Sequence, residues 1–297
     1  MKRWHLLLII IAVILVLVLA ITQIVKSSNS LISNNEIAVI PIEGVLSSFQ
    51  PSFPTMQTKD SQDIINSLEK ASKNKNIKAI ILEINSPGGT VIASKEVAEY
   101  VESIDKPVVS VIREVGASGA YWIASSSDLI IADELSITGS IGVTSSYLEF
   151  SGLLNKYNID YNQLTAGELK ELGSPLKELT NEERLILQKK LDKIHEVFLN
   201  QVKTKRKITD IDRIKTGEFF LGIEAKELGL VDKLGNMNLA VEEAKKLANI
   251  KEAKLIVYEE KTSLFSLFNT AASEASFNIG RGIGTELKTS KEYSINV

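Results

Sequence analysis

The stretch KAIILEINSPGGTVIASKEVAEYV, residues 78–101, decides the fold of this 297-residue chain. Its first part, Lys78–Ile84, is rich in Ile and barely alternates with polar residues, as expected of a strand covered on both faces. Its last part spaces apolar residues such as Val91 and Val101 at helical intervals and predicts a helix over residues 90–104. Pro and paired Gly between them are typical of a turn. A strand, a turn and a helix in this order form the building block of a parallel sheet.

The same alternation extends along most of the chain. Further apolar runs predict strands at Ile37–Ile42, Pro107–Ile112 and Leu129–Ala132. Amphipathic or charged patterns predict helices over residues 60–72, 180–203, 222–228 and 239–248. Thr180 and Glu183 have the spacing of a capping box at one helix start. We therefore expect an α/β fold with a mostly parallel sheet over residues 37–260, followed by a weakly structured tail at 261–297.

The composition excludes several kinds of site and partner. Lys and Arg number 34 and Asp and Glu 37, and this near balance argues against nucleic acid as a partner. The absence of Cys excludes disulfides, thiolate metal sites and a Cys nucleophile. The chain has only His5 and His195, so a His-rich metal site is excluded, and few histidines are available to act as the base of a Ser-His pair. We interpret His195, within a charged helix, as a surface residue.

The chain begins with an apolar segment that predicts a membrane anchor. Residues 6–25 would form a helix of roughly 30 Å at ~1.5 Å per residue, the hydrocarbon thickness of a bilayer. A cleaved signal peptide is the other interpretation, but the run exceeds the usual 7–15 apolar residues and KSSNS at 26–30 lacks a cleavage pattern. Basic residues before the run place residues 1–5 in the cytoplasm. We expect a single-pass protein of the cell membrane, with a polar stalk at 26–36 and an extracytoplasmic domain.

Two glycine-containing motifs follow predicted strands and contain candidate catalytic groups. Asn85–Thr90, NSPGGT, presents backbone N–H groups that can stabilise an anion, although a tight turn alone would also explain it. The second motif, GASGAYW at 116–122, places Ser118 among small residues at the start of a helical stretch. Ser118 is therefore either a nucleophile open to a substrate chain or an N-cap serine, a common use.

A serine nucleophile needs a base, and the sequence directs that search to lysine. No G-x-S-x-G or H-x-x-E-H pattern is present. A lysine accepts a proton only in its uncharged form, which requires a desolvated position. Lys170, in the segment AGELKELGSP at 166–175, is one of several candidates. A solvated loop lysine is the alternative, and its two Glu neighbours favour that interpretation.

Six segments, in the same order, resemble the signal peptide peptidase A family. They are IPIEGVL (40–46), INSPGGT (84–90), GASGAYWIA (116–124), SITGSIGV (136–143), AGELKELGSP (166–175) and GEFFLGIEAKELGLVDKLG (217–235). The resemblance covers residues 37–248. It implies a Clp protease/crotonase-like fold of repeated β-β-α units, in a membrane-anchored serine protease with a Ser-Lys dyad.

The resemblance also implies roles for individual residues. Ser118 corresponds to the nucleophile, Lys170 to the general base and Ser140 to a serine that orients the lysine. The oxyanion hole would use Gly119 together with one glycine of the pair at 88–89, and the choice between Gly88 and Gly89 stays open.

The sequence departs from the family pattern at one position. Ala120 stands where the family usually has a second Gly. A requirement for positive φ there would put activity in doubt, since alanine tolerates that conformation poorly.

The family's substrates are remnant signal peptides left in the membrane, and its short forms assemble into homo-oligomeric rings that can divide a site between neighbours. The partners implied are peptides, membrane lipid around residues 6–25 and further copies of this chain, with no metal or cofactor. Three alternatives stay open: a related Ser-Lys protease acting on other membrane proteins, a crotonase-like acyl-CoA enzyme, and a catalytically inactive scaffold.

Overall fold

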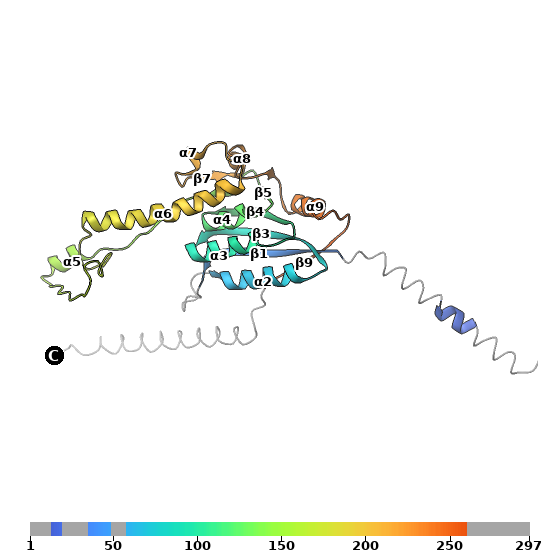
Figure 1. Cartoon of the computed structure of the whole chain (residues 1–297), viewed down its shortest axis with the longest axis horizontal. Helices are drawn as coiled ribbons and strands as arrows, with labels where there is room; N and C mark the ends of the chain where they lie inside the picture. The colour runs from blue at the N-terminus through green and yellow to red at the C-terminus, as the bar shows by residue number, and fades with distance from the viewer. Residues whose placement is uncertain (1–12, 20–34, 49–57, 260–297) are drawn as a thin grey trace, which may run out of the picture. The chain divides into compact units, whose positions relative to one another are not determined.

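The computed structural model describes residues 13–19, 35–48 and 58–259 (Figure 1). The strands are β1 (Glu36–Ser47), β2 (Thr58–Asp60), β3 (Ile77–Gly89), β4 (Val108–Ala117), β5 (Leu129–Ala132), β6 (Ile137–Gly139), β7 (Phe219–Leu221), β8 (Lys233–Leu234) and β9 (Lys254–Val257). The helices are α2 (Ser61–Lys73), α3 (Val91–Glu102), α4 (Gly119–Ser125), α5 (Ser151–Lys156), α6 (Asn181–Lys205), α7 (Ile211–Ile214), α8 (Gly222–Glu227) and α9 (Met237–Leu247).

The strands join in one mostly parallel sheet, which confirms the predicted α/β fold with a mostly parallel sheet. The main order is β2-β1-β3-β4-β5-β8, and every neighbouring pair in it is parallel. Strand β9 also runs parallel to β1, and β6 runs parallel to the end of β4. Among the described strands, only β7, paired with β6, is antiparallel to its neighbour. The helices that follow β3 and β4 therefore begin at the same edge of the sheet.

Helices cover both faces of the sheet, so the central strands are apolar on both sides. In β3, Ile80, Leu82 and Ile84 pack in the same cluster as residues of α2, α3 and α4. Ala79 and Ile81, which alternate with these residues along the strand, pack with α9 on the opposite face. Figure 1 shows α2 and α3 lying on one side of the strands and α9 on the other. This two-sided burial explains why the sequence run barely alternates.

The predicted turn at Asn85–Thr90 is wrong, because β3 continues through this motif to Gly89. Asn85 pairs with Glu43 of β1, and after a register shift Gly89 pairs with Leu46. Both flanking strands are also longer than predicted, and they satisfy the backbone groups of the motif within the sheet. The glycine pair is thus held in a sheet ladder, where its amides have fixed directions.

Several short elements were not predicted, and they share one physical feature. They are β2, β6, β7, β8, β9, α5 and α7. Most of them contain only two to four residues, too few to establish a period in the sequence. The short strands exist because a neighbouring strand pairs with them, as β6 does with β4.

The predicted membrane segment lies mostly outside the described residues. Residues 13–19 are helical and their side chains are exposed. No helix within 13–19, 35–48 or 58–259 is long and apolar enough to cross a membrane. The rest of the segment at 6–25 and the tail at 261–297 fall outside the described residues, as does nearly all of the stalk.

Helix α6 begins with the predicted capping box. Thr180 Oγ1 accepts a hydrogen bond from the Glu183 N–H at 3.2 Å, and Glu183 Oε2 accepts one from the Thr180 N–H at 3.0 Å. The hydrogen bond from the Lys177 ammonium, together with that backbone bond, holds the pKa of the Glu183 carboxyl below its usual range. The start of this long helix is therefore fixed by local hydrogen bonds.

We expect Thr180→Ala to lower the free energy of unfolding by about 1 kcal/mol, because it removes the side-chain acceptor for an orphan N–H. The measurement is the urea midpoint of the full chain. Thr165→Ala, at an exposed loop threonine, is the control and should leave the midpoint unchanged. Equal shifts in the two variants would contradict a specific role for the cap.

Candidate active site

A cavity of about 390 Å³ opens where β3, β4 and β6 end. Gly89 is the last residue of β3, Ser118 and Gly119 follow the end of β4, and Ser140 follows β6. All four residues line the cavity. The parallel strands thus bring residues from three separate sequence motifs to one place.

Ser118 occupies a strained position at the junction of β4 and α4. Its φ is 54° and its ψ is −124°, a region that residues other than glycine rarely adopt. The Ser118 N–H donates to the Gly139 carbonyl at 2.9 Å, which ties the junction to β6. Ser118 does stand at the N-cap position of α4, but its side chain makes no capping hydrogen bond, so the hydroxyl is not used as a cap. Such strain costs about 1–3 kcal/mol and clusters at active sites.

Gly88 allows the end of β3 to approach the backbone at the Ser118 junction closely. Its N–H donates to Ser86 Oγ at 3.1 Å, and that hydroxyl donates to the Gly44 carbonyl at 2.6 Å. Its φ is +102°, and a Cβ here would lie 2.7 Å from the Gly119 nitrogen. The amide of Gly88 is therefore engaged on the β1 side, and the missing side chain leaves room for the Ser118 junction.

Gly89 presents its amide in the opposite direction. Leu46 is its partner in β1, and the Leu46 carbonyl accepts from the Thr90 N–H at 2.9 Å. Because successive amides of a strand alternate between its two neighbours, the Gly89 N–H faces away from β1. A Cβ built on Gly119 would lie 3.3 Å from the Gly89 nitrogen, so the two residues are adjacent. Of the glycine pair, Gly89 has the geometry of an oxyanion donor.

The departure at Ala120 has no conformational consequence. Ala120 lies within α4, is completely buried and is absent from the residues with positive φ. Alanine is a favourable residue in a helix, so it replaces the family's second Gly without strain.

Ser140 is held beside Ser118 by the segment around β7. It has a positive φ of 49°, and its N–H donates to the Glu218 carbonyl at 2.9 Å. The next residue, Ile141, is contacted by His195 of α6, whose Nε2 lies 2.9 Å from the Ile141 carbonyl oxygen. The interpretation of His195 as a plain surface residue is therefore wrong, because its ring supports the segment that carries Ser140.

Lys170 does not line this cavity in the single chain. It is exposed, and its N–H donates to the Gly167 carbonyl at 3.1 Å within a turn. Residues 144–180, which contain it, are exposed or partly exposed except for Ser151. The structure thus brings together the predicted nucleophile, its neighbouring serine and two oxyanion candidates, while the predicted base lies elsewhere.

Residues 101–251 match the family model of peptidase family S49. A putative protease of Methanocaldococcus jannaschii is 36% identical over 241 residues, which cover 79% of this chain and 76% of that protein. The chain belongs to peptidase family S49. The Clp protease family model also matches, over residues 53–129.

A further relative and a solved structure are also similar to this chain. A putative signal peptide peptidase SppA of Enterococcus faecium is 31% identical over 240 residues, covering 79% of this chain and 70% of that protein. A solved structure of a mutant of the 1510-N membrane-bound stomatin-specific protease, in complex with a substrate peptide, has a TM-score of 0.50. It is 12% identical and covers 81% of this chain and 98% of that one, so it shows the fold alone.

This S49 peptidase is a serine endopeptidase, as its family and protease relatives show. Family membership favours peptide hydrolysis over the acyl-CoA chemistry that the fold alone would also allow.

The apolar wall of the S49 site was not predicted from the sequence. Val91, Trp122 and Phe198 line the cavity, and they come from α3, α4 and α6. The Trp122 and Phe198 rings stack with centroids 4.4 Å apart and planes 8° apart. The only sequence signal was the Trp one helical turn after Ser118, since Phe198 lies in a helix whose pattern looked charged.

Proposed function

We propose that this chain is a membrane-anchored Ser-Lys endopeptidase that hydrolyses remnant signal peptides, with Ser118 as its nucleophile. The observation that carries the proposal is the strained Ser118 junction, which lines a cavity together with Gly89 and Gly119. Backbone N–H groups placed beside a nucleophile stabilise the oxyanion that forms during acyl transfer.

The chemistry proposed is a two-step acyl transfer. An uncharged Lys170 amine takes the Ser118 proton as Oγ attacks the peptide carbonyl, and Gly89 and Gly119 hold the resulting oxyanion. The lysine then protonates the leaving amine, and the acyl-enzyme forms. Water, deprotonated by the same lysine, attacks the ester; as the acyl–Oγ bond breaks, the lysine returns that proton to Ser118 Oγ and the acid is released. Ser140, which lines the same cavity, would orient the lysine amine.

We further propose that Lys170 reaches the site from a neighbouring copy in a homo-oligomeric ring. Residues 144–180 carry nine large apolar side chains that are exposed in the single chain. They are Tyr147, Leu148, Phe150, Leu153, Tyr157, Ile159, Tyr161, Leu164 and Leu169. A concentration of exposed apolar side chains marks an interaction surface. Burying this segment against a second copy would cover these side chains and carry Lys170 with them.

The proposed substrates are peptides left in the bilayer, and the proposed location is the extracytoplasmic side of the cell membrane. Support comes from the apolar segment at 6–25, which would tether the domain near such peptides and raise their local concentration. The apolar wall of the cavity suits a hydrophobic side chain. The name of the Enterococcus faecium relative points to the same class of substrate.

A second candidate is a related Ser-Lys protease that cuts other membrane proteins. The 1510-N membrane-bound stomatin-specific protease, which has a similar fold, is an example of that kind. Catalysis would be the same, so the two are separated by profiling cleavage of signal-peptide remnants against intact membrane proteins.

The test of the catalytic proposal is labelling of the full chain with a serine-reactive fluorophosphonate, mapped by mass spectrometry. We expect label on Ser118, and we expect Lys170→Ala to lose it, because an unactivated serine reacts poorly. Absence of label on Ser118, with a control hydrolase labelled under the same conditions, would favour the inactive scaffold.

A further inference from the structure

The Trp122–Phe198 stack is the side of the cavity that a substrate side chain would meet. Both rings line the cavity, and both are nearly fully buried, with Trp122 only 2% exposed. The backbone N–H of Trp122 donates to the Ser118 carbonyl at 3.0 Å, so Trp122 lies one helical turn after the candidate nucleophile. The position of this indole therefore limits the space next to Ser118.

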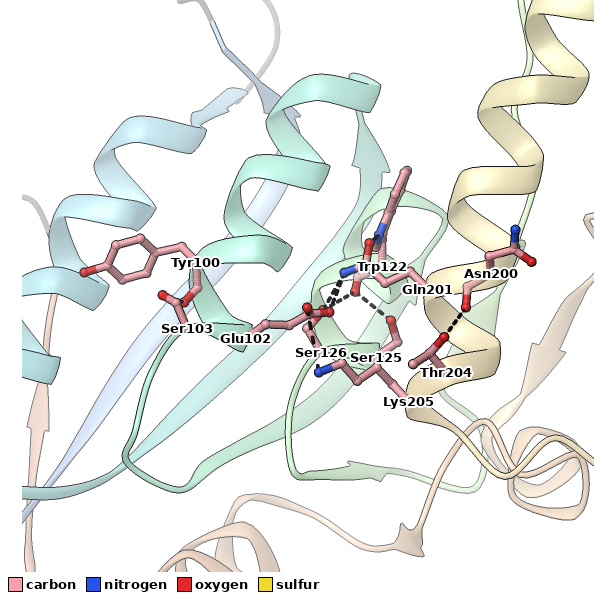
Figure 2. A network of polar contacts seen from close by, with 10 residues as sticks. All are labelled: Tyr100, Glu102, Ser103, Trp122, Ser125, Ser126, Asn200, Gln201, Thr204 and Lys205. Atoms are coloured by element: carbon pink, nitrogen blue, oxygen red, sulfur yellow. Dashed lines mark hydrogen bonds and ion pairs between the residues drawn. The ribbon is translucent and has the colours of Figure 1, made fainter.

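A network of polar side chains holds the indole of Trp122 through its ring nitrogen (Figure 2). Trp122 Nε1 donates to Gln201 Oε1 of α6 at 2.6 Å. Gln201 Nε2 in turn donates to Glu102 Oε1 at the end of α3, at 2.5 Å. Ser126 Oγ donates to the same carboxylate oxygen at 3.2 Å, and Lys205 Nζ lies 3.7 Å from Glu102 Oε2. The network joins three helices around one indole nitrogen.

The chemistry of these groups allows one arrangement of the Gln201 amide. The indole N–H of Trp122 can only donate, and an ionised Glu102 carboxylate can only accept. An amide between them must turn its oxygen to the indole and its NH₂ group to the carboxylate. The Glu102 carboxylate thus selects the orientation in which Gln201 can hold Trp122, and the buried indole N–H has a partner.

We propose that Gln201, oriented by Glu102, is a positioning residue that fixes the plane of Trp122 and thereby sets the size of side chain accepted beside the scissile bond. The inference rests on the proposed function, because it assigns the cavity to a peptide side chain. With the indole held parallel to Phe198, the wall is rigid and excludes a bulky ring. Without its partner the indole can tilt, and the size limit is relaxed.

The test measures binding of two peptides that differ only in having Leu or Phe at the residue before the scissile bond. The full chain carries Ser118→Ala, to prevent turnover, and Trp4→Phe, which leaves Trp122 as its only tryptophan. Quenching of Trp122 fluorescence gives each Kd. We expect the Leu peptide to bind about tenfold more tightly, the selectivity typical of a size-limited apolar pocket.

In Gln201→Met, which keeps the length but removes the hydrogen bonds to Trp122, Glu102 and Ser126, we expect the two Kd values to agree within about threefold. Glu102→Leu should behave in the same way and carries the test if the first variant does not fold. Glu102→Gln retains an acceptor for the amide and should restore the original ratio. Thr204→Ala, on the same helix, breaks only a bond to the Asn200 carbonyl and should leave the ratio unchanged.

Two results would overturn the inference. One is equal binding of the two peptides before Gln201 is changed, since the wall would then set no size limit. The other is an unchanged ratio in both Gln201→Met and Glu102→Leu. These binding ratios decide the matter even if the chain with intact Ser118 cleaves no peptide, an outcome that would instead count against the proposed function.

Discussion

Replacing Ser118 with alanine is expected to lower kcat/KM for peptide cleavage by at least about a thousandfold, because no other group can form the acyl-enzyme. The fold should persist, since the substitution removes only a hydroxyl that makes no capping hydrogen bond. Alanine has a methyl group in place of the hydroxymethyl group, so it meets the same strain at a φ of 54°. The measurement is steady-state cleavage of a fluorogenic peptide, with the thermal midpoint recorded on the same sample.

The matched control for this prediction is Ser103→Ala. Ser103 follows α3, and its Oγ donates to the Tyr100 carbonyl at 2.7 Å, away from the cavity. Its activity should stay within about twofold of the unaltered chain, as for most surface substitutions. Residual activity above a few per cent in Ser118→Ala, in protein free of unaltered chain, would remove Ser118 from the proposed role.

Mixing two inactive variants is expected to restore activity. Ser118→Ala keeps Lys170 and Lys170→Ala keeps Ser118, so a site shared between copies can be complete in a mixed ring. In a 1:1 random mixture, each site has an intact serine half of the time and an intact lysine half of the time. About a quarter of the original activity should therefore return, as head-to-tail contacts in a ring require.

The control for the mixture is the double variant Ser118→Ala with Lys170→Ala, combined with Ser118→Ala alone. It contains no intact serine and should restore nothing. Exchange of subunits must be followed separately, by energy transfer between labelled copies. No recovery in a mixture that exchanges would show that Lys170 does not act in a neighbour's site.

Much of the fold could be predicted because buried strands and helix starts have characteristic local sequence patterns. The strand at Leu129–Ala132 and the start of α6 at its capping box agree with the structure. Central strands with helices on both faces give apolar runs, and a capping box is a local hydrogen-bond pattern. Such features need no knowledge of distant residues.

What the sequence could not provide depends on partners elsewhere in the chain. Pro and Gly in the NSPGG motif predict a turn, but two neighbouring strands that extend beyond their predicted ends hold the motif in the sheet. The positive φ of Ser118 arises at a junction pinned by Gly139, and the contact of Phe198 with Trp122 spans two helices. None of these has a local signature.

The position of Lys170 marks another limit of the same kind. Its motif resembles that of the family base, yet in one chain it lies on an exposed segment. A residue that works in a neighbouring copy would have no contacts in its own chain from which its role could be inferred.

The proposed oxyanion site is made of main-chain amides, and this has a consequence for how the enzyme can diversify. A Cβ at Gly89 would lie 1.9 Å from the Leu46 carbonyl oxygen, so that position is closed to substitution. The apolar wall is different, because side chains such as Val91 can be exchanged without touching the sheet ladder. Laboratory evolution toward new peptide preferences should therefore accumulate its changes in the wall, while the main-chain donors continue to serve every substrate alike.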